Sequence, residues 1–385
     1  MREGWKYQKL GELVKVINGL WVGKKPPFTN VAVVRNANFT KSCTLDMSNI
    51  AYIDVEEKQF NTRELQYADI IIEKSGGSEK QPVGRPVFFN IKDRGYSFSN
   101  FTATLRVVSS DIVPEYLYKV LLAQYKQGVT KRLQSKTTGL HNLDFKSYLK
   151  SVIPIPSCEK QLSIVSELDK INELIRLKKE QLKDYDNLAQ SIFYEMFGDK
   201  KYERRKLKNI VKVKSGQVSP LEDPYCDMVH VGPANIESNT GRLINLTTAK
   251  EENLISGKYL FDSSMVLYSK IRPNLNKVTI ADFEGICSAD MYPLIPSKSI
   301  DKKFLLFILK QKEFLSYAIA NSGRANIPKI NREALLEYST ILPPLSLQLQ
   351  FAERLALIEK QKEQISSIIN DLETLLASRM QYWFD

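Results

Sequence analysis

The chain has 385 residues, 43% of them hydrophobic, and a formal net charge of +11 at pH 7. This length provides apolar material for two cores of ordinary size. Both halves share the excess of Lys and Arg, which suits a polyanionic partner such as nucleic acid and equally suits a mildly basic surface without that role. The sequence has no run near the ~18 apolar residues of a bilayer-spanning helix and no signal-like N-terminus, so we expect a cytoplasmic protein without a membrane partner. Four scattered cysteines fit the same reducing setting and argue against a zinc site.

The first predicted elements are short strands separated by turns. Apolar runs bounded by Gly and Pro are typical of strands, and the first half holds four, at Leu13–Ile17, Val31–Val34, Asp69–Ile72 and Phe98–Val108. Helical periodicity appears later, over Pro114–Tyr125. Clustered strands followed by one helix predict a strongly curved sheet with loops at its rim.

A long helix is predicted next, because Gln161–Phe197 contains neither Pro nor Gly. Its apolar residues recur at alternating spacings of three and four, which is the pattern of a coiled-coil seam. We take Leu168, Ile175, Leu182 and Ile192 as seam positions. At 1.5 Å per residue such a helix is about 55 Å long. The alternative is a helix hairpin buried in a single core, but the many Lys, Glu and Gln residues off the seam favour an exposed spacer.

The second half repeats these elements in the same order. The segments Lys9–Gly19, Pro114–Leu121 and Gln161–Phe197 return as Lys206–Gly216, Lys302–Leu309 and Gln348–Phe384. Strands are expected at Ile210–Lys214, Met228–Val231, Met265–Tyr268 and Val278–Ile280, and a helix over Asp301–Ala320. The second seam includes Leu355, Ile369, Leu376 and Trp383, and we expect the residues of both seams to pair the helices and to dock partner proteins. The pattern is that of a duplicated unit with loops of variable length, not of a short-period solenoid.

We therefore predict four regions. Two globular domains of mixed α/β character occupy residues 1–157 and 200–345, and each is followed by a long spacer helix, over 158–199 and 346–385. The fold class is α+β, because strands and helices are segregated along each half.

Loops at the rim of each sheet are the candidate contact surface for DNA. Glu73–Arg85 and its counterpart Tyr268–Lys277 mix small residues with cations, as do Ser135–Asn142 and Asn321–Lys329. Gly and Ser let a backbone approach a phosphate, whereas Lys, Arg and Asn bind phosphates or base edges. The candidate contacts are Lys74, Ser75, Lys80, Arg85, Ser135, Lys136, His141, Lys270, Arg272, Asn274, Lys277, Arg324, Asn326 and Lys329. A solvated turn accounts better for any single residue of this set, but the recurrence of the clusters in both halves favours binding by the set.

Signatures of catalysis are missing from the sequence. The chain has no phosphate-binding loop of the Gly-x4-Gly-Lys type and no Gly-x-Gly-x-x-Gly turn. Its two histidines, His141 and His230, fall in different halves, which argues against a histidine-based triad or metal cluster. We expect no catalytic residue, no bound metal and no cofactor on this chain.

Several of these segments resemble the DNA-specificity subunits of type I restriction–modification systems. The resemblance rests on the Lys-Leu-x-x-Leu/Ile-Val-Lys-Val opening of each half, on Pro343–Gln348 (Pro-Pro-Leu-Ser-Leu-Gln) at the second helix start, and on the helix ends at Met196–Phe197 and Trp383–Phe384. Ile155–Gln161 departs from the usual helix entry, with Ile in place of the first proline and one additional residue before the glutamine. The duplicated order of the segments carries the resemblance more than any one motif does.

The resemblance implies two target-recognition domains that read the two parts of a split sequence in double-stranded DNA. It also implies an antiparallel pair of spacer helices with pseudo-two-fold symmetry, which docks two modification (adenine methyltransferase) subunits, while restriction (translocase and nuclease) subunits join the complex. S-adenosylmethionine is then expected on the methyltransferase partner. Two alternatives remain: a coiled-coil adaptor without DNA contact, and a stand-alone DNA-modifying enzyme with an unrecognised site.

Overall fold

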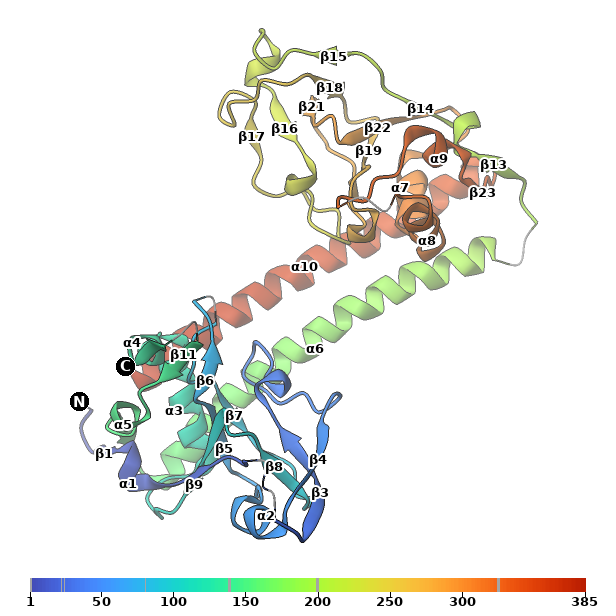
Figure 1. Ribbon diagram of the computed structural model, residues 1–385. Helices are drawn as coiled ribbons and strands as arrows, with labels where there is room; N and C mark the ends of the chain where they lie inside the picture. Colours follow the sequence, from blue (N-terminus) through green and yellow to red (C-terminus); the bar gives the residue numbers. More distant parts are fainter. Residues whose placement is uncertain are drawn as a thin grey trace. The chain divides into compact units, whose positions relative to one another are not determined.

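The duplicated sequence forms two structural units, and each unit contains a globular part and segments of both long helices (Figure 1). In this computed structural model, unit 1 comprises Met1–Lys179 and Ser367–Asp385, and unit 2 comprises Glu180–Ser366. The structure describes residues 2–385 apart from 22, 24, 80, 138, 139, 199, 200, 324 and 325, and apart from the side chains of 136 and 137.

The main sheet of unit 1 has four antiparallel strands in the order β2-β9-β5-β7: Val14–Asn18, Thr102–Val107, Ile70–Glu73 and Pro86–Phe88. A second sheet has the order β4-β3-β8, with β8 parallel to β3: Ala51–Glu56, Phe28–Val34 and Tyr96–Phe98. The others are β10-β11-β6 and β1-β12: Gln134–Thr137, Leu140–Leu143, Ser75–Gly77, Lys6–Lys9 and Val152–Ile155. The described helices of the globular part are α1 to α5: Leu10–Leu13, Glu57–Arg63, Pro114–Lys126, Val129–Arg132 and Phe145–Tyr148.

Unit 2 repeats this architecture. Its four antiparallel strands have the order β14-β22-β19-β20: Val211–Val213, Met291–Pro296, Val266–Ser269 and Val278–Thr279. A five-stranded sheet has the order β15-β18-β21-β16-β17, with β16 parallel to β21: Gln217–Val218, Lys258–Phe261, Gly285–Cys287, Val229–Val231 and Thr247–Thr248. The pair β13-β23, Arg204–Lys206 and Ser339–Ile341, corresponds to β1-β12.

The predicted helix over Asp301–Ala320 is two helices, α7 (Lys302–Lys310) and α8 (Lys312–Ala320). Gln311 between them has extended backbone angles, φ −65° and ψ 148°. The break turns the apolar faces of both helices into one core, because Leu305 and Phe314 are both buried in the same cluster. A short α9 (Arg332–Glu337) follows. The predicted strand Phe98–Val108 is likewise divided, into β8 and β9.

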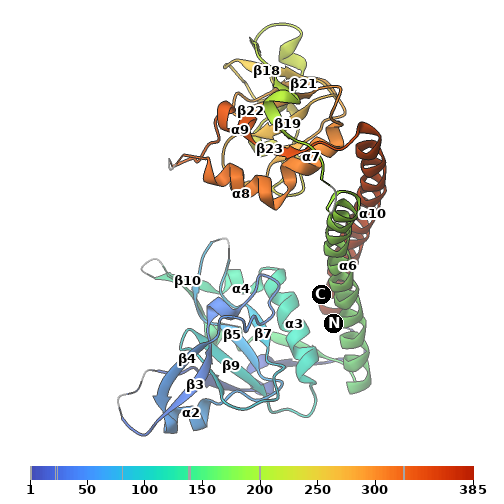
Figure 2. The ribbon, with the colours of Figure 1, turned by 90° about the vertical axis from the view of Figure 1, so that its right-hand side faces the viewer.

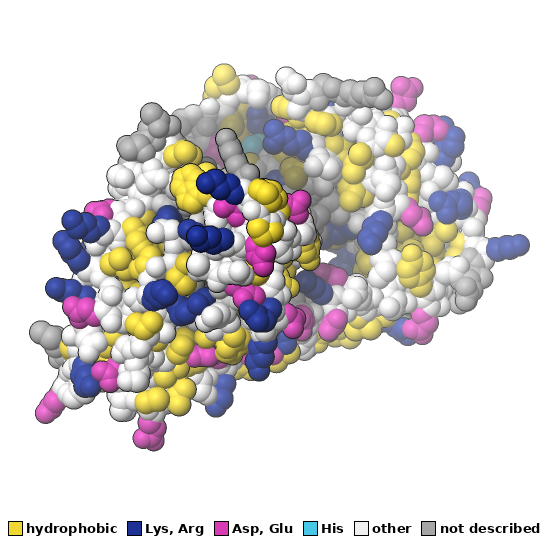
Figure 3. All heavy atoms as spheres, turned by 60° about the horizontal axis from the view of Figure 1, so that its bottom comes forward, with side chains coloured by type: hydrophobic (Ala, Val, Ile, Leu, Met, Phe, Trp, Pro, Cys, Tyr) yellow, Lys and Arg dark blue, Asp and Glu magenta, His cyan; other side chains and the backbone are white. Residues whose placement is uncertain are grey.

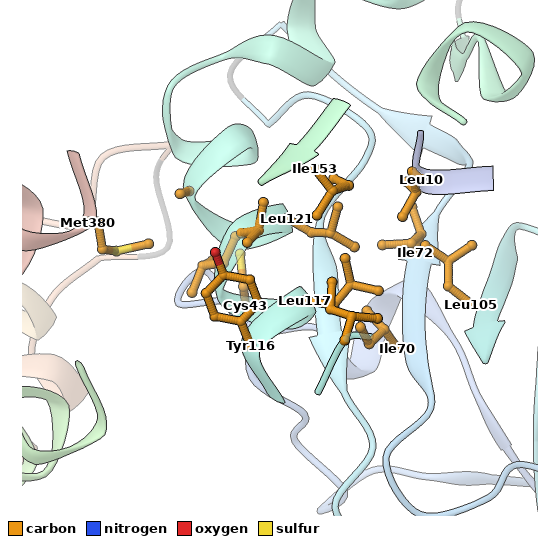
Figure 4. Packing of buried hydrophobic residues seen from close by; sticks show 14 of the residues in the cluster. Leu10, Cys43, Ile70, Ile72, Leu105, Tyr116, Leu117, Leu121, Ile153 and Met380 are labelled. Carbon is orange, nitrogen blue, oxygen red and sulfur yellow. The ribbon is translucent and has the colours of Figure 1, made fainter. Parts of the chain in front are cut away.

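The core of unit 1 lies between the four-stranded sheet, α3 and the long helices. Figure 2 shows α3 between this sheet and the first long helix. Figure 4 shows apolar side chains of the sheet and α3 packed together, with Met380 directed toward them from the second long helix. The core of unit 2 is built from the corresponding elements, because residues of β14, β19 and α7 pack against the long helices.

The long helices are α6, Cys158–Phe197, and α10, Leu345–Phe384. Within unit 1 they run antiparallel: Trp383 Nε1 donates to Glu167 Oε2 (3.0 Å), and Lys179 pairs with Glu373 farther along (2.7 Å). The predicted seam faces inward, because all eight of its chosen residues are buried or half-buried: Leu168, Ile175, Leu182, Ile192, Leu355, Ile369, Leu376 and Trp383.

A buried glutamine fixes the globular part of unit 1 to the start of α6. Gln161 is 0% exposed. Its Oε1 accepts from the backbone N of Val113, just before α3 (2.8 Å), and its Nε2 donates to the carbonyls of Asp111 (2.8 Å) and Pro156 (2.9 Å). One amide therefore joins three backbone segments: the entry to α3, the end of β12 and the first turn of α6. All three backbone groups depend on it for these bonds.

Unit 2 has the same arrangement around Gln348, which is also 0% exposed. Its Oε1 accepts from the N of Asp301 before α7 (2.9 Å), and its Nε2 donates to the carbonyls of Ser299 (3.0 Å) and Pro343 (2.7 Å). The correspondence is complete, bond for bond. The duplicated sequence thus preserves the attachment of each globular part to its long helix.

The side chains around these attachments differ between the units. In unit 1, Lys119 of α3 forms an ion pair with Asp169 of α6. The corresponding residue of α7 is Phe307. Its ring centroid lies 5.1 Å from that of Phe193 and 4.8 Å from that of Phe351. The same position on the globular helix therefore makes an ionic contact in unit 1 and aromatic contacts in unit 2.

We predict that Gln348→Ala lowers the free energy of unfolding by about 2–4 kcal/mol, because two carbonyls and one N–H lose their buried partner. Gln350→Ala, two residues away and exposed, is the matched control and should change it by less than ~0.5 kcal/mol. Urea denaturation followed by circular dichroism measures both. Equal midpoints for the two variants would contradict the role assigned to the buried amide.

Candidate nucleic-acid interface

The two predicted contact loops of unit 1 lie next to each other. The strand β6, which follows Lys74, pairs with β11, so that Ser75 lies opposite Asn142 and Gly77 opposite His141. The N of Leu143 also donates to the carbonyl of Lys74 (2.8 Å). Segments that are far apart in the sequence therefore form one surface at the rim of the sheet.

The corresponding loops of unit 2 meet in the same way. The N of Ile330 donates to the carbonyl of Lys270 (3.0 Å), and Ile271 forms an antiparallel bridge with Lys329. The N of Arg272 donates to the carbonyl of Pro328 (2.7 Å). We call the paired loops of each unit its recognition loops: 74–77 with 140–143 in unit 1, and 270–276 with 326–330 in unit 2.

The recognition loop of unit 2 has an unusual backbone. Arg272 and Asn276 both adopt left-handed angles, with φ of 47° and 48°, on either side of the short turn η5, Pro273–Leu275. Asn276 is held by its Nδ2, which donates to the carbonyl of Lys310 (3.3 Å). Arg272 and Asn274 are exposed on this turn. Both side chains are therefore accessible at the surface.

Arg85 belongs to the interior and not to the contact surface, which corrects the expectation from the sequence. Its side chain is 4% exposed and pairs with the buried Glu73 at 2.7 Å. Its Nη1 donates to the carbonyl of Phe39 (3.0 Å). Burial raises the pKa of the Glu73 carboxyl, and Arg85 opposes that shift. The guanidinium neutralises an interior charge and cannot contact DNA without leaving Glu73 unpaired.

Lys277 has the equivalent place in unit 2. The N of Ser269 donates to the carbonyl of Lys277 (3.0 Å), just as the N of Glu73 donates to that of Arg85 (3.1 Å). The Nζ of Lys277 donates to the carbonyl of Pro233 (2.6 Å). Arg85, which is buried, and Lys277, which is half-buried, therefore both hold a loop through an internal carbonyl, and neither belongs to the proposed contact set.

Lys74 and Lys270 are intermediate cases. The Nζ of Lys74 donates to Asn18 Oδ1 (2.8 Å), and burial lowers the pKa of this lysine. The Nζ of Lys270 donates to the carbonyl of Ala289 and lies 3.7 Å from Asp290 Oδ1. Each ammonium group is half-buried at the rim, and contact with a phosphate requires it to exchange these partners.

The remaining candidates differ in exposure. Ser135, Arg272, Asn274, Asn326 and Lys329 are exposed, and Ser75 is half-buried. His141 is 8% exposed, and its Nδ1 has no hydrogen-bond partner. Lys80 and Arg324 lie outside the described residues, as does the side chain of Lys136. Figure 3 shows Lys and Arg side chains interspersed with acidic and hydrophobic ones on the face that it draws.

The long helices carry a second apolar set that the seam analysis missed. These residues face outward with exposed fractions of 40–68%: Leu174, Leu177, Leu188, Leu357, Ile368 and Leu375. Ile368 and Leu375 are seven residues apart, and each directly precedes a seam residue, Ile369 or Leu376. A search for a second heptad register would therefore have found them. Four of them, Leu174, Leu177, Ile368 and Leu375, belong to unit 1, and Leu188 and Leu357 belong to unit 2.

One group of potential metal ligands occurs among the described residues. Asp223, Cys226 and Asp227 bring one ligand atom each within 4.8 Å of one another. A hydrogen bond to Asp223 raises the pKa of the Cys226 thiol, which keeps it protonated and makes it a poor ligand. The group lies at the surface, and no further observation connects it to an ion.

Among the described residues, no helix combines the length and the apolar character needed to cross a bilayer.

Comparison with known proteins finds the same family in both halves of the chain. The model of the type I restriction modification DNA specificity domain matches residues 2–184 and, a second time, residues 199–374. The specificity subunit of the type I restriction enzyme EcoDI from Escherichia coli is 36% identical over 176 residues. That match covers 44% of this chain and 39% of the EcoDI subunit, well under two thirds of its length.

A more distant relative matches along nearly the whole chain. The specificity subunit of the type I restriction enzyme MjaVIII from Methanocaldococcus jannaschii is 22% identical over 424 residues, covering 97% of this chain and 92% of that subunit. The S subunit of a type I restriction–modification system from M. genitalium has a similar fold, with a TM-score of 0.56, 13% identity and coverage of 99% and 96%. A chain from a type I R-M system, solved to explain complex assembly and conformational transition, has a TM-score of 0.60 at 16% identity, with coverage of 100% and 98%.

We predict that Arg85→Ala destabilises unit 1 by about 3–5 kcal/mol at pH 8, because Glu73 is left buried without its cation. Removal of the cation raises the folded-state pKa of Glu73 further above its unfolded value, so the folded variant binds a proton more readily than the unfolded chain does. The loss should therefore be smaller at pH 5 than at pH 8. Urea denaturation of variant and parent at both values measures it, and a loss that is the same at both contradicts the assignment.

Proposed function

Because the chain belongs to the family of type I restriction modification DNA specificity domains, we propose that it is the specificity subunit of a type I restriction–modification complex. Each unit reads one part of a bipartite target in double-stranded DNA. The observation that carries this proposal is the recurrence of the recognition loops: in both units two distant segments pair at the rim of the sheet. The loops of unit 2 present exposed polar and cationic residues, whereas Lys74, Ser75 and Asn142 of unit 1 are half-buried.

The residues of the loops fit the chemistry of a duplex. Arg272 and Lys329 are exposed cations on paired segments, and they suit phosphate oxygens or the acceptor edge of guanine. Asn274 and Asn326 have the donor and acceptor pair that matches adenine. In unit 1, the half-buried Ser75 suits a phosphate contact, as does the exposed Ser135 on the neighbouring strand β10. This set of residues contains few cations, which suits side chains that read base edges as well as bind the DNA backbone.

The long helices are assigned a spacing and docking role. An antiparallel pair of helices is stiffer than a flexible linker and defines the separation between bound half-sites better. Their outward apolar residues, Leu174, Leu177, Leu188, Leu357, Ile368 and Leu375, are proposed to contact two modification subunits, the adenine methyltransferases of the complex. Restriction subunits join the same assembly.

Chemistry is assigned to those partners. Methylation of adenine requires the base to leave the stack, and we place that pocket, together with S-adenosylmethionine, on the modification subunit. A stand-alone modifying enzyme is less favoured, since the family is one of DNA specificity. An adaptor without DNA contact does not account for the duplicated recognition loops. A subunit with this role acts where the genome is accessible, and we therefore place the protein in the cytoplasm.

We predict that Arg272→Ala combined with Lys329→Ala weakens binding of the assembled complex to its target. If each cation neutralises one phosphate, the slope of log K against log salt becomes shallower by about 1.8. Fluorescence anisotropy across salt concentrations measures the slope. The control is Lys250→Ala with Lys298→Ala, two exposed cations of unit 2 outside the recognition loops. A complex that enriches no sequence from a random pool, or an equal loss in the control, contradicts the proposal.

A separate prediction concerns docking. Leu357→Asp with Leu375→Asp should abolish co-purification of the modification subunit. Leu357 is 68% exposed and Leu375 45% exposed, and each substitution replaces an apolar contact with a charge. Since both side chains face solvent in the isolated chain, its stability should change by less than ~0.5 kcal/mol. Gln361→Asp, exposed on the same helix, is the control. Retention of the partner by the double variant, measured in a pull-down, excludes this face as the docking surface.

A further inference from the structure

Each recognition loop presents one exposed aliphatic side chain at the same structural position. In unit 1 it is Leu140, 48% exposed, and in unit 2 it is Ile327, 49% exposed. The positions correspond because each residue lies three places before a buried or core-packed residue, Leu143 or Ile330, whose N donates to the carbonyl of Lys74 or Lys270. Two different sequences thus place an apolar group of similar exposure at one site.

The surroundings make these two side chains unusual. In unit 2, Ile327 lies between the exposed Asn326 and the segment that brings Lys329 to Ile271. In unit 1, Leu140 opens β11, the strand that pairs with both β10 and β6 at the rim. A single exposed aliphatic side chain is common on a protein surface, but its recurrence at the same position of both recognition loops points to a shared ligand feature.

The partial burial of these groups limits what that ligand can be. Each residue is about half exposed, so it offers an apolar patch and not a fully protruding wedge that inserts between stacked bases. On the edges of a base pair, the apolar feature accessible from the major groove is the C5-methyl group of thymine. Methyl against aliphatic contact needs no hydrogen bond, which fits a Leu in one unit and an Ile in the other.

We propose that Leu140 and Ile327 are specificity-determining residues, each of which contacts the methyl group of a thymine in the part of the target that its own unit reads. This inference rests on the proposed function, because it presumes that both recognition loops meet DNA. It adds the class of base feature that each loop recognises, and it makes the two contacts independent of each other.

Replacement of thymine by uracil tests the contact, because it removes the methyl group and nothing else. The assembled complex first selects its target from a random duplex pool, and each thymine of that target is then replaced singly by uracil. For the parent protein we expect one replacement in each part of the target to weaken binding about fourfold, equivalent to about 0.8 kcal/mol at 1.4 kcal/mol per tenfold change.

Variants assign each methyl group to a residue. Leu140→Asn keeps the size of the side chain but removes its apolar surface, and it should abolish the uracil effect in one part of the target only. Ile327→Asn should do so in the other part only. Leu140→Ile should retain most of the effect. Val152→Ala, a change at a 56% exposed residue of unit 1 on β12, should leave both effects intact.

The outcomes separate this inference from the function on which it rests. A complex that selects no target contradicts the proposed function itself. A complex that selects a target, but whose uracil effects are unchanged in Leu140→Asn and Ile327→Asn, overturns the methyl contact and leaves the function standing. Loss of both uracil effects in either single variant contradicts the independence of the two contacts.

Discussion

A single buried amide in each unit is the constraint on which the rest of the structure depends. Gln161 and Gln348 each hold the entry of a globular helix, the end of a strand and the start of a long helix, through three hydrogen bonds that match between the units. An amide suits this task because it donates and accepts at fixed angles and carries no charge to desolvate. The orientation of each globular part on its helix follows from these bonds, and with it the direction in which the recognition loops face.

The two units share buried hydrogen bonds that shape their backbones, although many side chains differ. Asn38 accepts from the N of Arg35 and donates to the carbonyl of Asp46, and Asn235 accepts from Gly232 and donates to Asn245 in the same way. The recognition loops, in contrast, share backbone pairing but few side chains. A duplicated scaffold of this kind allows each half to read a different sequence without altering how its loops are supported.

The long helices could be predicted from the sequence, because uninterrupted heptads without Pro or Gly are compatible with few structures besides a long helix. The loops at the sheet rim could be predicted as well, although not that they pair within each unit, since pairing is a tertiary property. Arg85 was misplaced because an arginine in a Gly-rich loop is ordinarily exposed, and its burial depends on Glu73, twelve residues earlier and indistinguishable from a surface acid. Gln161 and Gln348 were visible only as matching positions at the start of a polar helix, so their burial was not predicted.

The contrast between Lys119–Asp169 in unit 1 and the Phe193, Phe307 and Phe351 rings in unit 2 has a physical consequence. Dissolved electrolyte screens an ion pair whose carboxylate is 56% exposed, whereas strongly hydrated anions such as sulfate reinforce the burial of aromatic surface. A rise in ionic strength therefore weakens one of the contacts that hold the globular part of unit 1 to its helix, whereas the aromatic contact of unit 2 has no charge to screen. The two halves of this protein, alike in architecture, differ in how their attachment depends on the surrounding electrolyte.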